Sequence, residues 1–111
     1  MIHEMNLHEG PFISIKNKTK TVEMRLNDEK RSKIKIGDTI VFTNNISGEK
    51  IEVVVEDIKK YESFALLYQD YNQVEIGYGY DDIVDPSDMD IYYSKEKQKL
   101  YGCLAIRIRV I

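Results

Sequence analysis

The chain has 111 residues and a net charge of -3, which is the length of a single domain, residues 1–111, with room for one hydrophobic core. It contains no apolar run long enough to span a bilayer and no basic-then-apolar start resembling a signal peptide, so we expect a cytoplasmic protein that does not enter a membrane. Its one cysteine, Cys103, excludes an intramolecular disulfide and a cysteine zinc site, and is expected to be a small buried hydrophobe.

The charges are segregated along the chain. Residues 16–35 hold eight lysines and arginines against three acids, whereas residues 61–94 hold eight acids and no lysine or arginine. This asymmetry permits nucleic acid to contact a local basic surface, and it excludes nonspecific electrostatic binding over the whole surface of the protein. Two solvated surfaces with no ligand are the alternative explanation.

Hydrophobic alternation and β-branched runs predict most of the chain to be extended. The expected strands are 5–7, 21–26, 39–43, 51–59 and 102–111. Gly37-Asp38 is typical of a turn before the third strand, and residues 44–48 are expected to close a hairpin between the third and fourth. In the second strand, Val22, Met24 and Leu26 form the core face and leave the other face to chemistry or solvent.

Three helices are expected between these strands. The first starts at Gly10-Pro11 and ends at 17–19, the second covers 62–71, and the third starts at Asp85-Pro86, where Asp85 can cap free amides. Residues 77–82 are predicted to be a loop. The element order predicts an α+β, mainly β fold, a small barrel or curled sheet with flanking short helices.

Lys20, Glu23 and Arg25 are the densest group of chemically able side chains. Glu23 and Arg25 are two residues apart on a strand and therefore project from one face, while Lys20 at the strand's beginning can reach into a cleft. Lys20 and Arg25 could bind a phosphate or a carbonyl oxygen, Lys20 could transfer a proton if burial lowers its pKa, and Glu23 could orient a water or a base amine. An exposed ion pair on the barrel rim is the alternative.

All eight tyrosines lie between residues 61 and 101. Tyr68 and Tyr71 have the spacing of a helix core, whereas Tyr78 and Tyr80 alternate with glycine in the predicted loop and are candidates for stacking on a base. The chain has no phosphate-binding glycine loop, no Gly-x-Ser-x-Gly motif and no EF-hand spacing. We therefore expect no cofactor and no metal site.

The chain resembles the ASCH domain family of the PUA-like superfamily. The family pattern Gly-x-Lys-x-x-Glu-x-Arg is matched by Lys20, Glu23 and Arg25, with Lys18 in place of the glycine. The further matches are Pro11-Phe12-x-x-Ile15, Gly37-Asp38, Tyr61-x-Ser63-Phe64, Met89-x-x-Tyr92-Tyr93-Ser94 and Tyr101-Gly102. The resemblance implies a small PUA-like β-barrel with flanking helices, a cleft beside the motif, and RNA or a modified nucleoside as partner.

Two functions remain open from this resemblance. In the first, a cleft binds RNA or a modified nucleoside through Lys18, Lys20, Glu23, Arg25, Tyr93 and Ser94. In the second, the chain is a small hydrolase like the relatives that act on N4-acetylcytidine, or a ribonuclease, with Lys20, Glu23 and Glu75 as catalytic residues.

Those amidohydrolase relatives have a threonine where this chain has Glu23, so the chemistry would change from a hydroxyl nucleophile to a water attack. A ligand-sensing or protein-interaction module is a third class. The ligand's identity and the oligomeric state are not predicted.

Overall fold

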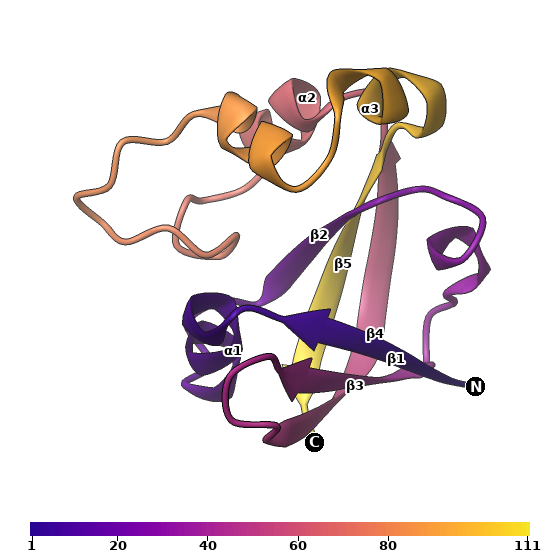
Figure 1. Ribbon diagram of the computed structural model, residues 1–111, viewed down its shortest axis with the longest axis vertical. Coiled ribbons are helices and arrows are strands. Elements are labelled where there is room, and N and C mark those ends of the chain that lie inside the picture. The colour runs from indigo at the N-terminus through magenta and orange to yellow at the C-terminus, as the bar shows by residue number, and fades with distance from the viewer.

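The computed structural model describes residues 1–111 as a curved five-stranded sheet with short helices packed at its ends (Figure 1). The elements are β1 (Ile2–Leu7), α1 (Glu9–Lys16), β2 (Val22–Leu26), the 3-10 helix η1 (Arg31–Lys33), β3 (Thr39–Asn44), β4 (Lys50–Tyr61), α2 (Phe64–Gln69), the 3-10 helix η2 (Pro86–Ile91), α3 (Lys95–Tyr101) and β5 (Cys103–Val110). The mainly β prediction with short helices is confirmed. No helix is long and apolar enough to cross a membrane.

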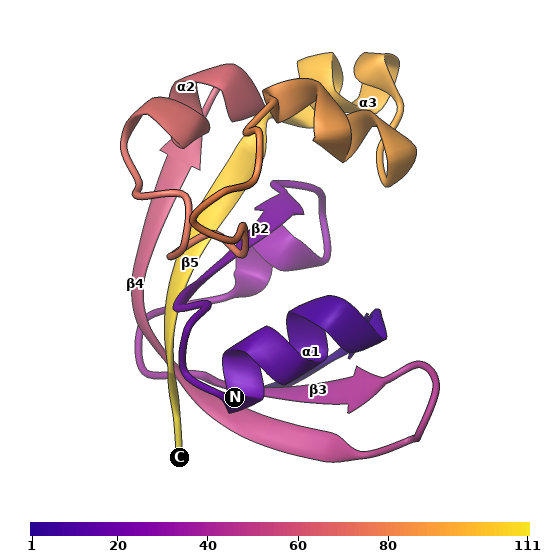
Figure 2. The same cartoon turned by 90° about the vertical axis from the view of Figure 1, so that its left-hand side faces the viewer.

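The sheet has the strand order β1-β3-β4-β5-β2, with β1 parallel to β3 and every other pair antiparallel. β4 and β5 run from one end of the molecule to the other (Figure 2), and a register shift between Val55 and Asp57 interrupts their pairing. β1 and β2 are the two edges of the sheet. The curvature makes it a half-barrel in which these edges approach each other without pairing.

Two apolar clusters form the core, and β5 supplies residues to both. Leu104, Ile106 and Ile108 pack in a cluster of 12 buried residues with α1, β1, β3 and β4, as the alternating pattern predicts. Cys103 and Ala105 pack in a second cluster of nine buried residues beneath α2 and η2. The start of β5 is therefore buried on both faces, and Cys103 is the buried hydrophobe that we expected.

The expected helices are present with different bounds. α1 begins at Glu9, so Pro11 stands in its first turn rather than at its first position. The third helix is the 3-10 helix η2, although Asp85 caps it as predicted by accepting from the Ser87 amide at 2.9 Å. α3 was not predicted, because it has no buried residue and therefore no apolar periodicity in the sequence.

α1 ends in a Schellman motif that places Lys18 in the left-handed region, with φ 66°. The Lys18 amide donates to the Ile15 carbonyl at 2.9 Å and the Thr19 amide to the Ser14 carbonyl at 3.0 Å. Glycine is the residue best suited to this conformation because it has no Cβ. Lys18 is the chain's one non-glycine residue with positive φ, and it occupies the position of the motif glycine.

We predict that Lys18→Gly raises the free energy of unfolding by about 1 kcal/mol, because it removes the Cβ strain of the left-handed conformation. Lys16→Gly is the matched control. The same change inside the helix lowers the free energy of unfolding by up to about 1 kcal/mol, because glycine has poor helix propensity. Urea unfolding of the three proteins measures both effects, and a destabilised Lys18→Gly variant would contradict the assignment of strain to this residue.

Candidate functional site

The Lys20 to Arg25 segment lies at the edge of the sheet, where β2 pairs with β5 alone. The Lys20 amide donates to the Ser14 carbonyl at 3.1 Å, and the Thr21 and Val22 amides both donate to the Glu75 carbonyl at 3.0 Å. The end of α1 and the 72–77 segment therefore fix the start of the strand, and with it the side chain of Lys20.

Glu23 is buried between two cations. Its Oε1 lies 2.9 Å from Lys20 Nζ and accepts from the Met24 amide at 3.0 Å. Its Oε2 accepts from Arg25 Nε at 3.1 Å and from Arg25 Nη2 at 3.0 Å. The side chains of Glu23 and Lys20 are only 4% and 8% exposed, so the alternative of an exposed ion pair on the rim is wrong.

Arg25 also joins the two edges of the sheet. Its Nη2 donates to the backbone carbonyl of Asn6 on β1 at 2.9 Å. β1 and β2 share no backbone ladder, so a guanidinium spans the opening of the half-barrel where a closed barrel would have paired strands. The opening between these two edges is where a cleft lies.

The electrostatics of the group keep Glu23 ionised. Burial alone would raise the pKa of its carboxyl, but the positive charges of Lys20 and Arg25, with the hydrogen bonds from Lys20 and Met24, outweigh burial and hold the pKa at about 2. Burial opposes the charge of Arg25, yet the neighbouring Glu23 carboxylate raises the pKa of the guanidinium. A buried group of charges is weak evidence for a stabilising role, and titratable groups with perturbed pKa values are frequent at functional sites.

A cleft of about 580 Å³ opens beside these charges. Lys20, Glu23 and Arg25 line it, as do Gly10 and Pro11 at the start of α1. Gly77 lies over Lys20. A Cβ on Gly77 would stand 3.1 Å from Lys20 Cδ, and the residue has a φ of 108°, so glycine allows the loop to pack directly on the lysine.

Four tyrosines also line the cleft: Tyr68, Tyr78, Tyr92 and Tyr93. Tyr93 stacks on Phe64 with their rings 7° from parallel and 6.1 Å apart, which holds it in place. The Tyr78 hydroxyl donates to Asp88 Oδ2 at 2.7 Å and lies 3.0 Å from the Tyr68 hydroxyl. Burial and these two hydrogen bonds raise the pKa of the Tyr78 hydroxyl. Of the two predicted stacking residues, Tyr78 lines the cleft, whereas Tyr80 is 86% exposed and does not.

Four of the predicted site residues, Lys20, Glu23, Arg25 and Tyr93, line this cleft, and the other three do not. Lys18 ends α1. Ser94 caps α3 by accepting from the Lys97 amide at 3.2 Å, and the Glu75 carboxylate lies 3.1 Å from Arg107 Nη1.

Other residues that were not predicted as site residues also line the cleft, among them His8, Arg31 and Asp88. Arg31 was visible only as one cation of the basic segment 16–35. No group of three or more His, Cys, Asp or Glu residues could hold a metal ion.

The five-stranded half-barrel with short helices defines a PUA-like domain. A family model described as the ASCH domain matches residues 5–111. The chain belongs to the ASCH domain family, which is associated with RNA binding.

Solved structures agree with this assignment. The crystal structure of the hypothetical protein PH0355 is 32% identical over 100% of both chains, with a TM-score of 0.84. The solution structure of protein PF0455 from Pyrococcus furiosus is 36% identical over 100% of this chain and 98% of that one, with a TM-score of 0.78. The S128A mutant of ZmASCH from Zymomonas mobilis, at 16% identity, covers 97% of this chain and 67% of its own with a TM-score of 0.68, and shares the fold. Comparison with curated proteins gives no match.

We predict that Glu23→Gln lowers the free energy of unfolding at pH 7 by about 3 to 5 kcal/mol, because it leaves two buried cations without their counter-charge. The pKa of Glu23 is about 2 in the fold against 4.5 ordinarily, so its stabilisation is present above pH 4.5 and is lost as the pH falls toward 2. Urea unfolding at several pH values should show that the difference in free energy of unfolding between wild type and variant becomes smaller as the pH falls from 4.5 to 2. A difference that does not change with pH would contradict the low pKa of Glu23.

Proposed function

We propose that the cleft binds RNA or a modified nucleoside, with Lys20 and Arg25 as the hydrogen-bond donors that meet the ligand. The observation that carries this proposal is the set of contacts to Glu23. Its carboxylate uses its acceptor sites on Lys20, the Met24 amide and Arg25, and so holds both cations in fixed positions at the cleft. Such preorganised cations lose little freedom when a ligand binds.

The two cations have more hydrogen-bond donors than their contacts within the protein use. The Lys20 ammonium has three N–H groups and a single ion-pair partner, Glu23, and the Arg25 guanidinium has five N–H groups, of which those on Nε and Nη2 donate to Glu23 and Asn6. Free donors on two cations suit a ligand rich in acceptors, such as a phosphate or the carbonyl oxygen of a base. The ring of Tyr93, also on the cleft, is suited to stacking on a base.

Binding is favoured over hydrolysis by the state of the carboxylates. A carboxylate with a pKa of about 2 and four donors on its oxygens is a poor general base for a water. Glu75, the other candidate, directs its carboxylate to Arg107.

We therefore expect purified protein incubated with N4-acetylcytidine to release no more cytidine than its Lys20→Met variant. Release that depends on Lys20 would favour the hydrolase instead.

We predict that Lys20→Met weakens binding of a randomised pool of short single-stranded RNA by about tenfold or more, since a charge-assisted hydrogen bond contributes about 1.5 to 3 kcal/mol. Methionine keeps the aliphatic packing against Gly77, and Glu23 keeps Arg25 as partner, so the variant should fold. Fluorescence anisotropy measures the affinity.

Lys97→Met, which changes an exposed lysine of α3, is the control and should bind as wild type does. A folded Lys20→Met variant with wild-type affinity would show that the ligand binds elsewhere.

A further inference from the structure

Arg31 is a second guanidinium on the cleft, from a segment outside the Lys20 to Arg25 motif. It begins η1, and its Nη1 lies 2.8 Å from Asp28 Oδ2. Its Nε is buried and has no hydrogen-bond partner. A buried N–H without an acceptor is costly in a folded protein, and here it belongs to a residue that lines the cleft.

Arg25, Arg31 and Tyr93 line the same cleft. Burial raises the pKa of the Tyr93 hydroxyl, the positive charges of Arg25 and Arg31 oppose this rise, and the Glu23 and Asp28 carboxylates add to it. Two guanidinium groups and a phenol hydroxyl on one cleft are hydrogen-bond donors of the kind that bind the oxygens of a phosphate.

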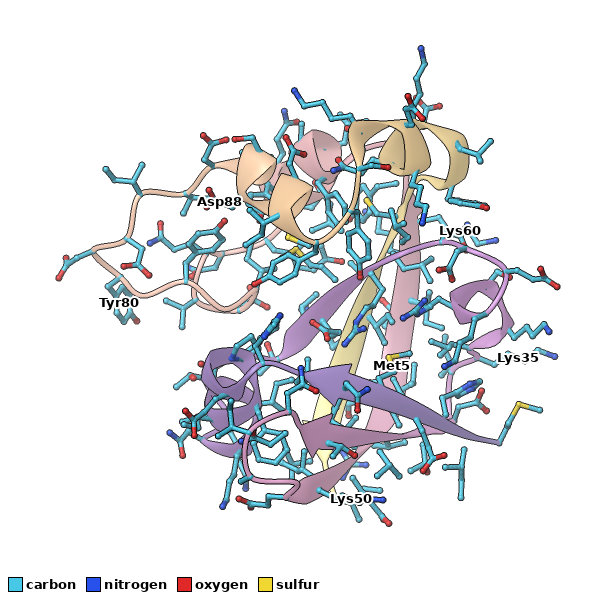
Figure 3. The ribbon with its side chains drawn as sticks, viewed as in Figure 1. Met5, Lys35, Lys50, Lys60, Tyr80 and Asp88 are labelled. Atoms are coloured by element: carbon cyan, nitrogen blue, oxygen red, sulfur yellow. The ribbon has the colours of Figure 1, made fainter.

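The surface beyond Arg31 continues this positive charge. Lys30, Lys33 and Lys35 are exposed on η1 and its flanks, and none has an ion-pair partner. The segment from the 77–82 loop to η2 is acidic: it carries Asp81, Asp82, Asp85 and Asp88, of which Asp88 lines the cleft. Figure 3 shows Lys35 on the opposite side of the molecule from Tyr80 and Asp88. A polyanion leaving the cleft is therefore attracted toward η1 and repelled from the loop.

We infer that the occupant of the cleft is a nucleotide within a single-stranded RNA, with a phosphate at Arg25 and Arg31 and the backbone continuing over Lys30, Lys33 and Lys35. This inference rests on the proposed function and chooses between its two ligands. A free nucleoside carries no phosphate and would leave Arg31 and the three lysines unused. An RNA strand uses both the cleft and the basic surface of η1.

The test compares two triple variants of equal charge change. Lys30, Lys33 and Lys35 are replaced by Ala in one, and Lys95, Lys97 and Lys99 of α3 in the other. Binding of randomised short single-stranded RNA is measured over a range of salt concentrations. The η1 variant should lose about tenfold or more in affinity, and its slope of log K against log salt should become shallower by about 2, since each phosphate contact to a single strand contributes about 0.7. The α3 variant should match wild type.

A second comparison tests the phosphate directly. Wild type should bind cytidine 5′-monophosphate more tightly than cytidine, and Arg31→Gln should remove this difference while Arg31→Lys restores part of it. The substituted lysines are exposed, so the η1 variant should have the melting temperature of wild type. Its RNA-binding comparison therefore still tests the inference if Arg31→Gln does not fold.

The possible results distinguish failure of the proposed binding function from failure of the inference that the ligand is a single-stranded RNA. If wild type binds no RNA and neither cytidine nor its monophosphate, the proposed function fails. If wild type binds RNA while the η1 variant keeps its affinity and salt slope, this inference fails and the proposed function stands. Equal losses in the η1 and α3 variants, or equal affinity of wild type for cytidine and RNA, would also overturn the inference.

Discussion

The arrangement of the cleft depends on one buried carboxylate, that of Glu23. It fixes Lys20 and Arg25 at once, and each of those cations has a further attachment: Lys20 lies under Gly77, and Arg25 reaches the carbonyl of Asn6. Charges in a protein interior are costly unless they are paired and hydrogen-bonded, and this group meets both conditions. The sheet edge, the loop above it and the first strand are thereby tied to the same ionised group.

The topology explains why such a group is needed. The outer strands β1 and β2 face each other across the opening of a half-barrel, and unpaired strand edges invite unwanted pairing. Arg25 spans this opening through its side chain, which leaves the space beside it free for a ligand. A closed barrel would place backbone hydrogen bonds there. The cleft and the buried charges are thus consequences of the same incomplete closure.

The sequence was sufficient for the strands, because β-branched runs and turn residues are local signals, and for the motif itself. The sequence was not sufficient to predict that Glu23 is buried. Alternating charges on a strand resemble a solvent-facing pattern, and only in the folded chain do Lys20, Arg25 and the Met24 amide surround the Glu23 carboxylate. Arg31 and His8 come to the cleft from separate segments, which no spacing rule connects. The Glu75 side chain was proposed for catalysis from a loose match, yet it is the Glu75 backbone carbonyl that supports the motif.

The central claim is that Glu23 stays an ionised support while Lys20 and Arg25 meet the ligand. Side-chain NMR of isotopically labelled protein tests it most directly, by following the Lys20 Nζ, the Arg25 Nη and the Glu23 carboxyl resonances as single-stranded RNA is added. The account predicts that the two cations shift on saturation while the carboxyl carbon stays at its ionised position. Saturation with RNA that leaves both cations unperturbed, or that protonates Glu23, would contradict it.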